Sequence, residues 1–448
     1  MKILRWTGLS AVLIGATVVL LHAAGYDMSD VKDVITGPNV FTDYQKEKPG
    51  TFRKITVADL PKPFATKSAG NPPTEVPKPD NMWPLAPAGF KVERFVDEDQ
   101  FKAIEGGNAR LQPRELRAAP NGDIFLADSQ ANKIVILRGV GADGKPKQTS
   151  VFADSSLREP FGIAFYPLGN DPKWVYVGNT DSVVRFPYKG GDLKAGGAAE
   201  TIVPSLPKGG GHWTRDLAFS PDGSKLFVAV GSASNIDNPD THKTEFHRAN
   251  ILEFTPDGKF IEVYASGIRN PVGIAVNPIT GQLWCSVNER DALGDNLVPD
   301  YITSVREGGF YGWPFYYMGD HPDPRLNGAH PELASKVIVP DVLLQPHNAS
   351  LEMMFYGGSQ FPQQYRGDIF AAEHGSWNRS VRAGYEVIRV PLVDGKASGV
   401  YEDFLTGFVT PDGNAWGRPV GVATASDGSI LVSDDVSKSV WRVIYTGK

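Results

Sequence analysis

One histidine in the sequence directly follows a run of three glycines: His212, after Gly209–Gly211. A β-rich segment, a Pro-Asp-Gly turn and a second β-rich segment come next; this half of the pattern recurs along the chain, whereas the glycine–histidine half occurs once. A neutral imidazole can accept a proton from an alcohol or a hydrated aldehyde. His212 is therefore a candidate general base, and the alternative is a histidine with a structural or surface role.

Arginines precede two other apolar segments. Arg269 stands before Asn270-Pro271, and Arg418 stands before Pro419 in the same register. Arginines that converge on one mouth of a fold would bind a ligand with several carboxylates, because guanidinium and carboxylate groups pair in a bidentate way. The alternative for each arginine is an isolated surface ion pair, which contributes little to stability.

Two further loops carry polar residues. Residues 288–295 read NERDALGD, and residues 374–379 read HGSWNR. Carboxylate and carbonyl oxygens are ligands that Ca²⁺ prefers, so the first loop is a candidate calcium site; the alternative is a solvated acidic turn. The sequence has no P-loop, no H-E-x-x-H, no G-x-S-x-G and no GxGxxG between a strand and a helix. Nicotinamide, ATP and serine-esterase chemistry therefore lose their usual support.

Composition limits the remaining classes. The 448 residues are 41% hydrophobic and 21% charged, as in soluble globular proteins. The net charge of −6 argues against a nucleic-acid partner, which requires a basic surface. The single cysteine, Cys285, excludes an intramolecular disulfide, and its flanking residues predict a small buried strand residue. Abundant glycine and proline indicate many turns between short strands.

The N-terminus resembles an export signal. Two basic residues, Lys2 and Arg5, precede an apolar run over residues 6–24. The run is followed by small residues that a peptidase could cleave, but it is also just long enough to span a bilayer. We expect an exported, periplasmic protein, with a cleaved signal or an anchor over residues 6–24 as the two alternatives.

The elements that must position these residues form a repeated module, in which a short apolar strand, a turn and a second β-rich strand follow one another. Six copies begin at Leu116, Phe161, Asp216, Val272, Met353 and Val420. The spacing leaves room for two more strands per copy. Six four-stranded sheets packed around an axis would cover the exposed strand edges, so the sequence predicts an all-β, six-bladed β-propeller. A stacked β-solenoid, the alternative, would have shorter and more uniform repeats.

We therefore divide the chain into three parts. Residues 1–25 are a signal peptide or membrane anchor, and residues 26–87 are a Pro-rich extension or linker that lacks periodicity. Residues 88–448 form the predicted propeller.

Four segments, taken together, resemble the sorbosone dehydrogenase and soluble glucose dehydrogenase family, and most closely its sorbosone dehydrogenase branch. They are GGGHWTRDLAFSPDG, GIRNPVGIAV, NERDALGDN with the later GGFYGWP, and GRPVGVATASDGSILVSDD. The resemblance extends from about Phe90 to the C-terminus. It implies a propeller that binds pyrroloquinoline quinone (PQQ) and Ca²⁺ and oxidises a sugar or a sugar-derived aldehyde.

The resemblance also implies roles for individual residues. His212 matches the histidine that accepts the substrate proton while hydride passes to the quinone. The implied cofactor contacts are Arg269, Asn270, Arg379 and Arg418, and the implied calcium loop gives Asp291, Ala292 and Asp295 as metal ligands.

Three positions depart from the soluble glucose dehydrogenases. Ser232 stands where those enzymes have an aspartate that orients the histidine, and a serine cannot supply a negative charge. Their lysine after blade five is replaced within residues 376–379, and Val420 replaces a second arginine. Glucose specificity is therefore not implied.

Two functions remain from the sequence. The first is an exported PQQ- and calcium-dependent sugar or aldehyde dehydrogenase with a separate electron acceptor, a quinone or a cytochrome. The second is a non-catalytic propeller that binds a ligand or a protein at a decayed cofactor site. The presence of His212, Arg269, Asn270 and Arg418 together favours the enzyme. A third function, Ca²⁺-dependent lactone hydrolysis, would require a cluster of axial carboxylates that the sequence does not identify.

Overall fold

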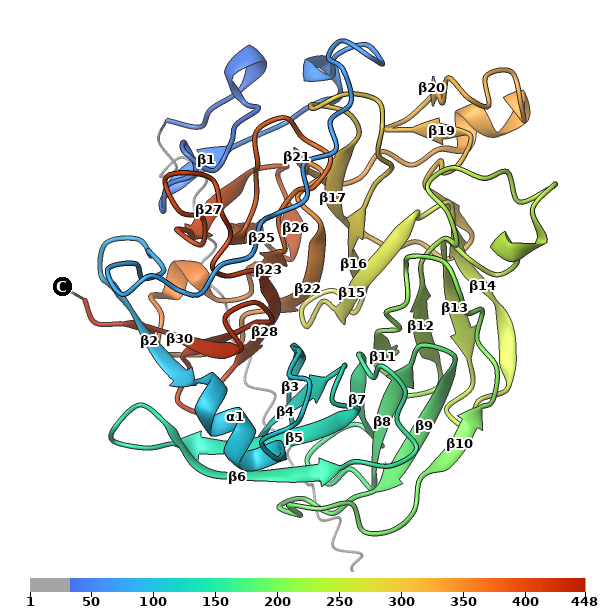
Figure 1. The fold of residues 1–448 in the computed structure, drawn as a ribbon. Helices are drawn as coiled ribbons and strands as arrows, with labels where there is room; N and C mark the ends of the chain where they lie inside the picture. Colours follow the sequence, from blue (N-terminus) through green and yellow to red (C-terminus); the bar gives the residue numbers. More distant parts are fainter. Residues whose placement is uncertain (1–32, 448) are drawn as a thin grey trace, which may run out of the picture.

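Six antiparallel sheets are arranged around a central axis in the computed structural model, which describes residues 33–447 (Figure 1). The prediction of a six-bladed β-propeller is confirmed. The proposed signal or anchor, residues 1–25, lies outside the described residues. Between residues 33 and 447, no helix is long and apolar enough to cross a membrane.

Each blade has four main strands, which follow one another from the axis outwards. Blade one is β3 (Pro113–Ala118), β4 (Ile124–Asp128), β5 (Lys133–Val140) and β6 (Pro146–Ala153); blade two is β7 (Ile163–Tyr166), β8 (Trp174–Asn179), β9 (Ser182–Pro187) and β10 (Glu200–Val203); blade three is β11 (Leu217–Phe219), β12 (Leu226–Val230), β13 (Asn250–Phe254) and β14 (Phe260–Ser266). Blade four is β15 (Asn270–Val276), β16 (Leu283–Asn288), β17 (Pro299–Ser304) and β21 (Val342–Pro346); blade five is β22 (Ser350–Phe355), β23 (Ile369–Glu373), β24 (Glu386–Val390) and β27 (Tyr401–Leu405); blade six is β28 (Pro419–Thr424), β29 (Ile430–Asp434), β30 (Ser439–Tyr445) and β2 (Phe90–Val96).

The remaining elements are short. The α-helix α1 (Glu98–Glu105) follows β2, and β1 (Thr51–Arg53) and β18 (Gly309–Phe310) extend the outer edges of blades five and three. Two small ribbons are formed by β19 (Tyr316–Tyr317) with β20 (His321–Pro322) and by β25 (Leu392–Val393) with β26 (Lys396–Ala397). Residues 33–447 also contain the 3₁₀ turns η2 (Gly37–Asn39), η3 (Val57–Asp59), η4 (Lys243–Glu245), η5 (Pro331–Lys336) and η6 (Gln363–Tyr365).

The inner hairpins form because their turns are encoded locally. In blade three, the amide of Gly223 donates to the carbonyl of Ser220 (2.8 Å), and Gly223 has a φ of 71°, which favours glycine. Asp222 accepts a hydrogen bond from the Ser220 hydroxyl at 2.6 Å. Gly122 and Gly428 close the corresponding turns of blades one and six in the same way.

The ring of blades is closed in blade six, where a strand that precedes blade one pairs with the last strand of the chain. β2 is the outermost strand of blade six and pairs antiparallel with β30, with Phe90 opposite Tyr445. The outer edge of the last blade is thereby covered by residues from before the first blade.

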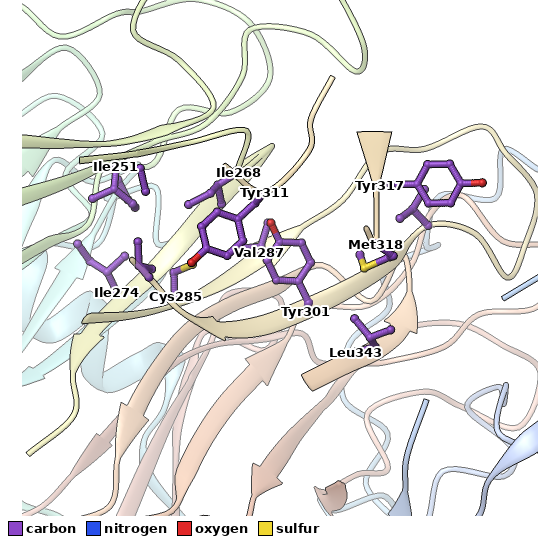
Figure 2. Close-up of a cluster of buried hydrophobic side chains, with 14 of the residues drawn as sticks. Ile251, Ile268, Ile274, Cys285, Val287, Tyr301, Tyr311, Tyr317, Met318 and Leu343 are labelled. Atoms are coloured by element: carbon purple, nitrogen blue, oxygen red, sulfur yellow. The ribbon is translucent and has the colours of Figure 1, made fainter. Parts of the chain in front are cut away.

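The hydrophobic core consists of layers between neighbouring sheets. Figure 2 shows the layer that includes Ile251 of blade three and Ile274, Cys285 and Tyr301 of blade four, all fully buried. Cys285 lies in β16, as predicted, and burial raises the pKa of its thiol far above the usual range. Full burial of each aliphatic side chain contributes about 1.5 to 3 kcal/mol.

Residues before β2 pack against the propeller. β1 pairs with β27 of blade five, and Leu85 and Thr406 form an isolated antiparallel bridge. Arg53 is buried and forms an ion pair with Asp403 of β27 at 3.1 Å. In Figure 1 this blue segment crosses blades five and four before it reaches β2.

Candidate active site

A cavity of 450 Å³ opens at the end of the axis where the innermost strands begin. Its wall combines segments that precede innermost strands with segments that follow second strands. The lining residues are Gly211, His212, Ala233, Ser234 and Asn235 from blade three; Arg269, Asn288, Glu289, Asp291 and Asp300 from blade four; His347, Ala349, Leu351, His374, Gly375 and Trp377 before and within blade five; and Arg418 from blade six. A larger cavity, 650 Å³, beside the outer strands of blade three contains none of the predicted site residues.

Strand register explains why residues far apart in sequence meet there. Asn270 of β15 lies opposite Asn288 of β16, so Arg269 comes next to Glu289. In blade six, Pro419 lies opposite Asp434. Each inner hairpin therefore presents two loop residues to the same end of the axis.

His212 is held through one ring nitrogen. Its Nδ1 lies 2.8 Å from the Ser232 carbonyl and 3.0 Å from the Ser232 hydroxyl, and that hydroxyl donates to the carbonyl of Ser234 at 2.6 Å. Because both neighbours of Nδ1 act as acceptors, the proton resides on Nδ1, and Nε2 is left as the basic nitrogen.

Burial is the main influence on the charge of His212. Burial and the charge of Arg269 lower its pKa to about 3, although the Ser232 carbonyl opposes the change. The imidazole is therefore neutral at neutral pH and able to accept a proton, but it is a weaker base than an exposed histidine.

The loop that holds His212 is itself braced. The Glu245 carboxylate accepts hydrogen bonds from the amides of Ala233 and Ser234, both at 2.9 Å. Arg248 donates to the carbonyl of Gly209 at 2.7 Å and to that of Gly231 at 3.2 Å. Glu245 and Arg248 are nearly fully buried, and their hydrogen bonds hold the main chain around Ser232 in place.

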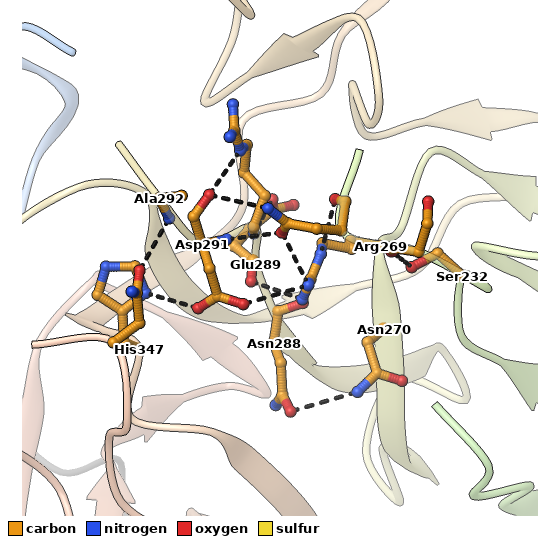
Figure 3. Close-up of polar contacts among 12 residues, drawn as sticks. Ser232, Arg269, Asn270, Asn288, Glu289, Asp291, Ala292 and His347 are labelled. Atoms are coloured by element: carbon orange, nitrogen blue, oxygen red, sulfur yellow. Dashed lines mark hydrogen bonds and ion pairs between the residues drawn. The ribbon is translucent and has the colours of Figure 1, made fainter. Parts of the chain in front are cut away.

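Arg269 is fully engaged within the protein. Its guanidinium donates to the main-chain carbonyls of Asn235 (3.2 Å), Asn288 (3.3 Å) and Glu289 (2.7 Å), and to the side chains of Asn235 (3.0 Å) and Asp291 (3.4 Å). These contacts use all five donors of an arginine. Arg269 lines the cavity. Its contacts in Figure 3 hold the loop after β16 in place.

Asp291 lies between two basic side chains (Figure 3). One carboxylate oxygen is 3.1 Å from Nδ1 of His347, and the other is 3.4 Å from Arg269. Burial raises the pKa of Asp291, but the His347 hydrogen bond and the Arg269 charge together lower it below the usual value. Asp291 is therefore ionised and already paired.

The predicted calcium ligands have hydrogen-bond partners within the protein. The Asp295 carboxylate accepts the Ser380 amide at 3.0 Å, whereas the Ala292 amide donates to Asn378 at 2.8 Å. Across residues 33–447, no three His, Cys, Asp or Glu side chains are grouped so as to hold a metal ion.

Main-chain oxygens of the same loop are also engaged. The carbonyls of Glu289 and Asp291 accept from Arg269 and Asn235, and that of Gly294 lies 3.0 Å from His347 Nε2. Of the three predicted ligands, Asp291 alone lines the cavity.

Arg418 fits an anionic ligand better. Its Nε donates to the carbonyl of His374 at 2.9 Å, and the one carboxylate within 4 Å of it among the described residues is the half-exposed Glu75, at 3.6 Å. The guanidinium also lies 5.7 Å from the ring centre of Tyr385. A carboxylate-bearing quinone would find at Arg418 a guanidinium that no buried carboxylate of the described residues contacts within 4 Å.

Asn270 and Arg379 lie behind the cavity wall. The Asn270 side-chain nitrogen donates to Asn288 at 3.3 Å, and the Asn270 side-chain oxygen Oδ1 is buried without a hydrogen-bond partner among the described residues. Arg379 donates to Asn296 at 3.1 Å, and two of its nitrogens are buried without a hydrogen-bond acceptor in the described chain. Neither lines the cavity.

Sequence reasoning missed three parts of the site. Asn235 joins Arg269 to the amide of Asp291, and His347 joins Asp291 to Gly294. The third is Asp435, which holds Nε2 of the cavity residue His374 at 3.0 Å and pairs with Arg114 at 2.7 Å. The positions of His347, just before β22, and of Asp435, just after β29, are those of other residues at this end of the axis, and could have indicated both.

Axial carboxylates are also present, deeper in the channel. Glu115 and Asp216 lie 2.7 and 3.0 Å from Arg117, and Glu352 lies 3.8 Å from it. A guanidinium of the protein itself thus supplies the positive charge beside these carboxylates.

The fold and cavity define a six-bladed propeller with a polar ligand site at one axial mouth. The model of the glucose/sorbosone dehydrogenase family matches residues 162–378, and that of the TrAA12-like family matches residues 329–446. Just under half of the chain thus matches the glucose/sorbosone dehydrogenase family, which the chain resembles. Its assignment to the sorbosone branch remains a prediction.

Similar proteins come from distant organisms. An uncharacterized protein of Borreliella burgdorferi is 29% identical over 372 residues, which are 80% of this chain and 90% of that protein. A pyrroloquinoline quinone-dependent pyranose dehydrogenase of Coprinopsis cinerea is 25% identical over 385 residues. That match covers 70% of this chain and about half, 51%, of the enzyme.

Solved structures support the fold. The PQQ domain of the Coprinopsis enzyme has a TM-score of 0.64 and 21% identity, with coverage of 82% of this chain and 98% of that domain. The calcium structure of a family AA12 protein from Trichoderma reesei has a TM-score of 0.66 and 18% identity, with coverage of 81% and 97%.

Proposed function

We propose that the protein is a PQQ-dependent dehydrogenase that oxidises a sugar or a sugar-derived aldehyde. One observation carries the proposal: His212 presents a basic Nε2 in the same cavity that Arg418 lines, with its Nδ1 fixed by Ser232. The Coprinopsis relative, described as a PQQ-dependent pyranose dehydrogenase, supports the choice of cofactor and substrate class.

Three cavity residues would have different roles. Arg418 would hold a carboxylate of the quinone, and Arg269 would keep the loop that bears Asp291 in place. Bound PQQ would supply a hydride acceptor. His212 would take the proton of the substrate hydroxyl at Nε2, and the Ser232 carbonyl would stabilise the Nδ1–H of the resulting imidazolium.

We also propose that the protein binds Ca²⁺. The calcium structure of the Trichoderma relative and the cavity-facing carboxylate of Asp291 favour it. Protein donors engage the Asp291 carboxylate and the carbonyls of Glu289 and Asp291, so Ca²⁺ would have to displace any of these contacts that it takes over. No step of the mechanism is assigned to the ion.

Export is also proposed, on the sequence of residues 6–24 alone. Electrons would then pass to a separate quinone or cytochrome outside the cytoplasm. Mass spectrometry of the exported protein distinguishes a cleaved signal from a retained membrane anchor.

Titration of the apo-protein with PQQ, with and without saturating Ca²⁺, tests the function. We expect saturable binding by absorbance and dye-linked oxidation of aldoses or aldehydes. Binding without Ca²⁺ would remove calcium from the proposal. Failure to bind PQQ under both conditions would overturn the enzyme and favour a non-catalytic binding propeller.

A further inference from the structure

A segment of the N-terminal extension contacts the loops that carry the predicted site residues. We call residues 64–76 the rim segment. It contacts, in order, the loop after β16, the loop after β23 and the loop before β28, which together carry five of the predicted cofactor and metal residues.

Main-chain hydrogen bonds fix its first two contacts. The amide of Phe64 donates to the carbonyl of Leu293 at 2.8 Å, and the amide of Asn71 donates to the carbonyl of Trp377 at 2.7 Å. Between them, the Thr66 hydroxyl accepts the amide of Asp295 at 2.7 Å. The rim segment is therefore attached to the site loops of blades four and five.

The third contact places a carboxylate beside the site. The amide of Ala415 donates to Thr74 and the amide of Val76 donates to Ala415, both at 2.9 Å. These bonds hold the main chain of Glu75 next to the loop that ends in Arg418. The Glu75 carboxylate lies 3.6 Å from Arg418 and is 53% exposed, so it can move while its main chain is fixed.

Other carboxylates near Arg418 are engaged elsewhere. Asp435 binds Arg114 and His374, and Asp434 accepts the main-chain amide of Arg418. Glu75 is therefore the negative charge that an incoming anion would meet at this arginine.

We propose that Glu75 occupies the position of a ligand carboxylate at Arg418 and lowers the affinity of the cavity for anionic ligands, PQQ in particular. The inference rests on the proposed function, because it takes Arg418 as the arginine that binds a quinone carboxylate. Glu75 is thus a residue that tunes ligand affinity from outside the propeller sheets.

The test compares Glu75→Gln with the unchanged protein by PQQ titration followed through tryptophan fluorescence, with Ca²⁺ present. Exposed ion pairs are worth about 0.2 to 1 kcal/mol, so we expect the PQQ Kd to fall about 1.5- to 5-fold at low salt. The change should shrink in high salt, because exposed charges are screened.

Two variants serve as controls. Asp80→Asn removes an exposed carboxylate of the same extension and should leave the Kd unchanged. In an Arg418→Ala background, Glu75→Gln should have no further effect, because the pair no longer exists.

An equal or higher Kd for Glu75→Gln, or an effect that persists without Arg418, would overturn the inference while leaving the proposed function intact. If the unchanged protein binds no PQQ, both fall together. Melting temperatures of all variants check that the fold is retained.

Discussion

Ser232 fixes the ring of His212 through neutral acceptors, its carbonyl and its hydroxyl. Their partial charges orient Nδ1–H without adding the full negative charge that an aspartate would bring. The consequence is a base that is well oriented but weak, with a pKa lowered mainly by burial to about 3.

Replacing His212 by alanine tests its role as a base. Turnover should fall about 10²- to 10⁴-fold, the usual contribution of a positioned proton acceptor, while PQQ affinity and melting temperature change little. Single-turnover quinone reduction and thermal unfolding on the same preparation measure both. A destabilised variant that keeps full turnover per folded molecule would show that His212 is structural.

The pH dependence of the rate also tests whether His212 is the base. Because burial lowers the pKa to about 3, protonation of His212 should reduce the rate only as the pH approaches that value, well under the ordinary histidine range near 6.5. In Ser232→Asp, the added negative charge favours the imidazolium, so the acid limb should move to higher pH. Ser232→Ala keeps the carbonyl acceptor and is the matched control.

At the scale of elements, the loop after β16 depends on Arg269, whereas Arg418 lines the cavity with the half-exposed Glu75 as its carboxylate partner. Arg269→Lys should lower the melting temperature, because a lysine has three donors on one atom in place of the five donors that the planar guanidinium uses here. Arg418→Ala should leave the melting temperature unchanged but weaken PQQ binding by about 1.5 to 3 kcal/mol, the range for hydrogen bonds to charged groups.

Thermal unfolding and PQQ titration of both variants separate the two roles. A melting temperature for Arg269→Lys equal to that of the unchanged protein would contradict the brace. A normal PQQ Kd for Arg418→Ala would contradict its placement in the cofactor site.

The inner hairpins were predictable because each is encoded over about fifteen residues, as in the Ser220–Gly223 turn. Their loops met at one mouth as expected, since a shared register carries Arg269 and Arg418 to equivalent positions. The partners of those loops were not predictable. Asn235 and His347 reach Asp291 from 56 residues away on either side, a separation on which local patterns carry no information.

The rim segment illustrates the same limit. Its prolines and missing periodicity predicted an extension, and nothing in residues 64–76 indicated which blades it would contact. Only the fold brings Glu75 to Arg418, 343 positions later in the chain.

At the scale of the whole molecule, buried carboxylates on the axis join the blades. Glu115 of blade one accepts the amide of Ile163 in blade two at 3.1 Å, and Asp216, just before β11 of blade three, accepts that of Ile274 in blade four at 2.7 Å. Glu352 of blade five accepts amides of blades one and six. Arg117 lies among the three and supplies their positive charge.

Burial raises the pKa values of Glu115 and Glu352 well above the usual range, and Arg117 opposes the rise. A carboxyl whose pKa is raised on folding stabilises the folded state below its unfolded pKa, and that contribution is lost as pH rises through the folded pKa. The axis should therefore be less stable at alkaline than at mildly acid pH, and Arg117 should limit the loss.

Arg117→Met removes the cation and retains much of its volume. Breaking a buried ion pair from one side costs about 3 to 5 kcal/mol, so we expect a loss of this size in the free energy of unfolding at neutral pH. The loss should become smaller towards pH 5, because the carboxyls can then fold in their neutral form. Denaturant unfolding at a series of pH values measures it, with Arg185→Met, which removes a partly exposed arginine paired with Glu200, as the control. A loss independent of pH would show that Arg117 acts through packing and that its charge does not hold the blades together.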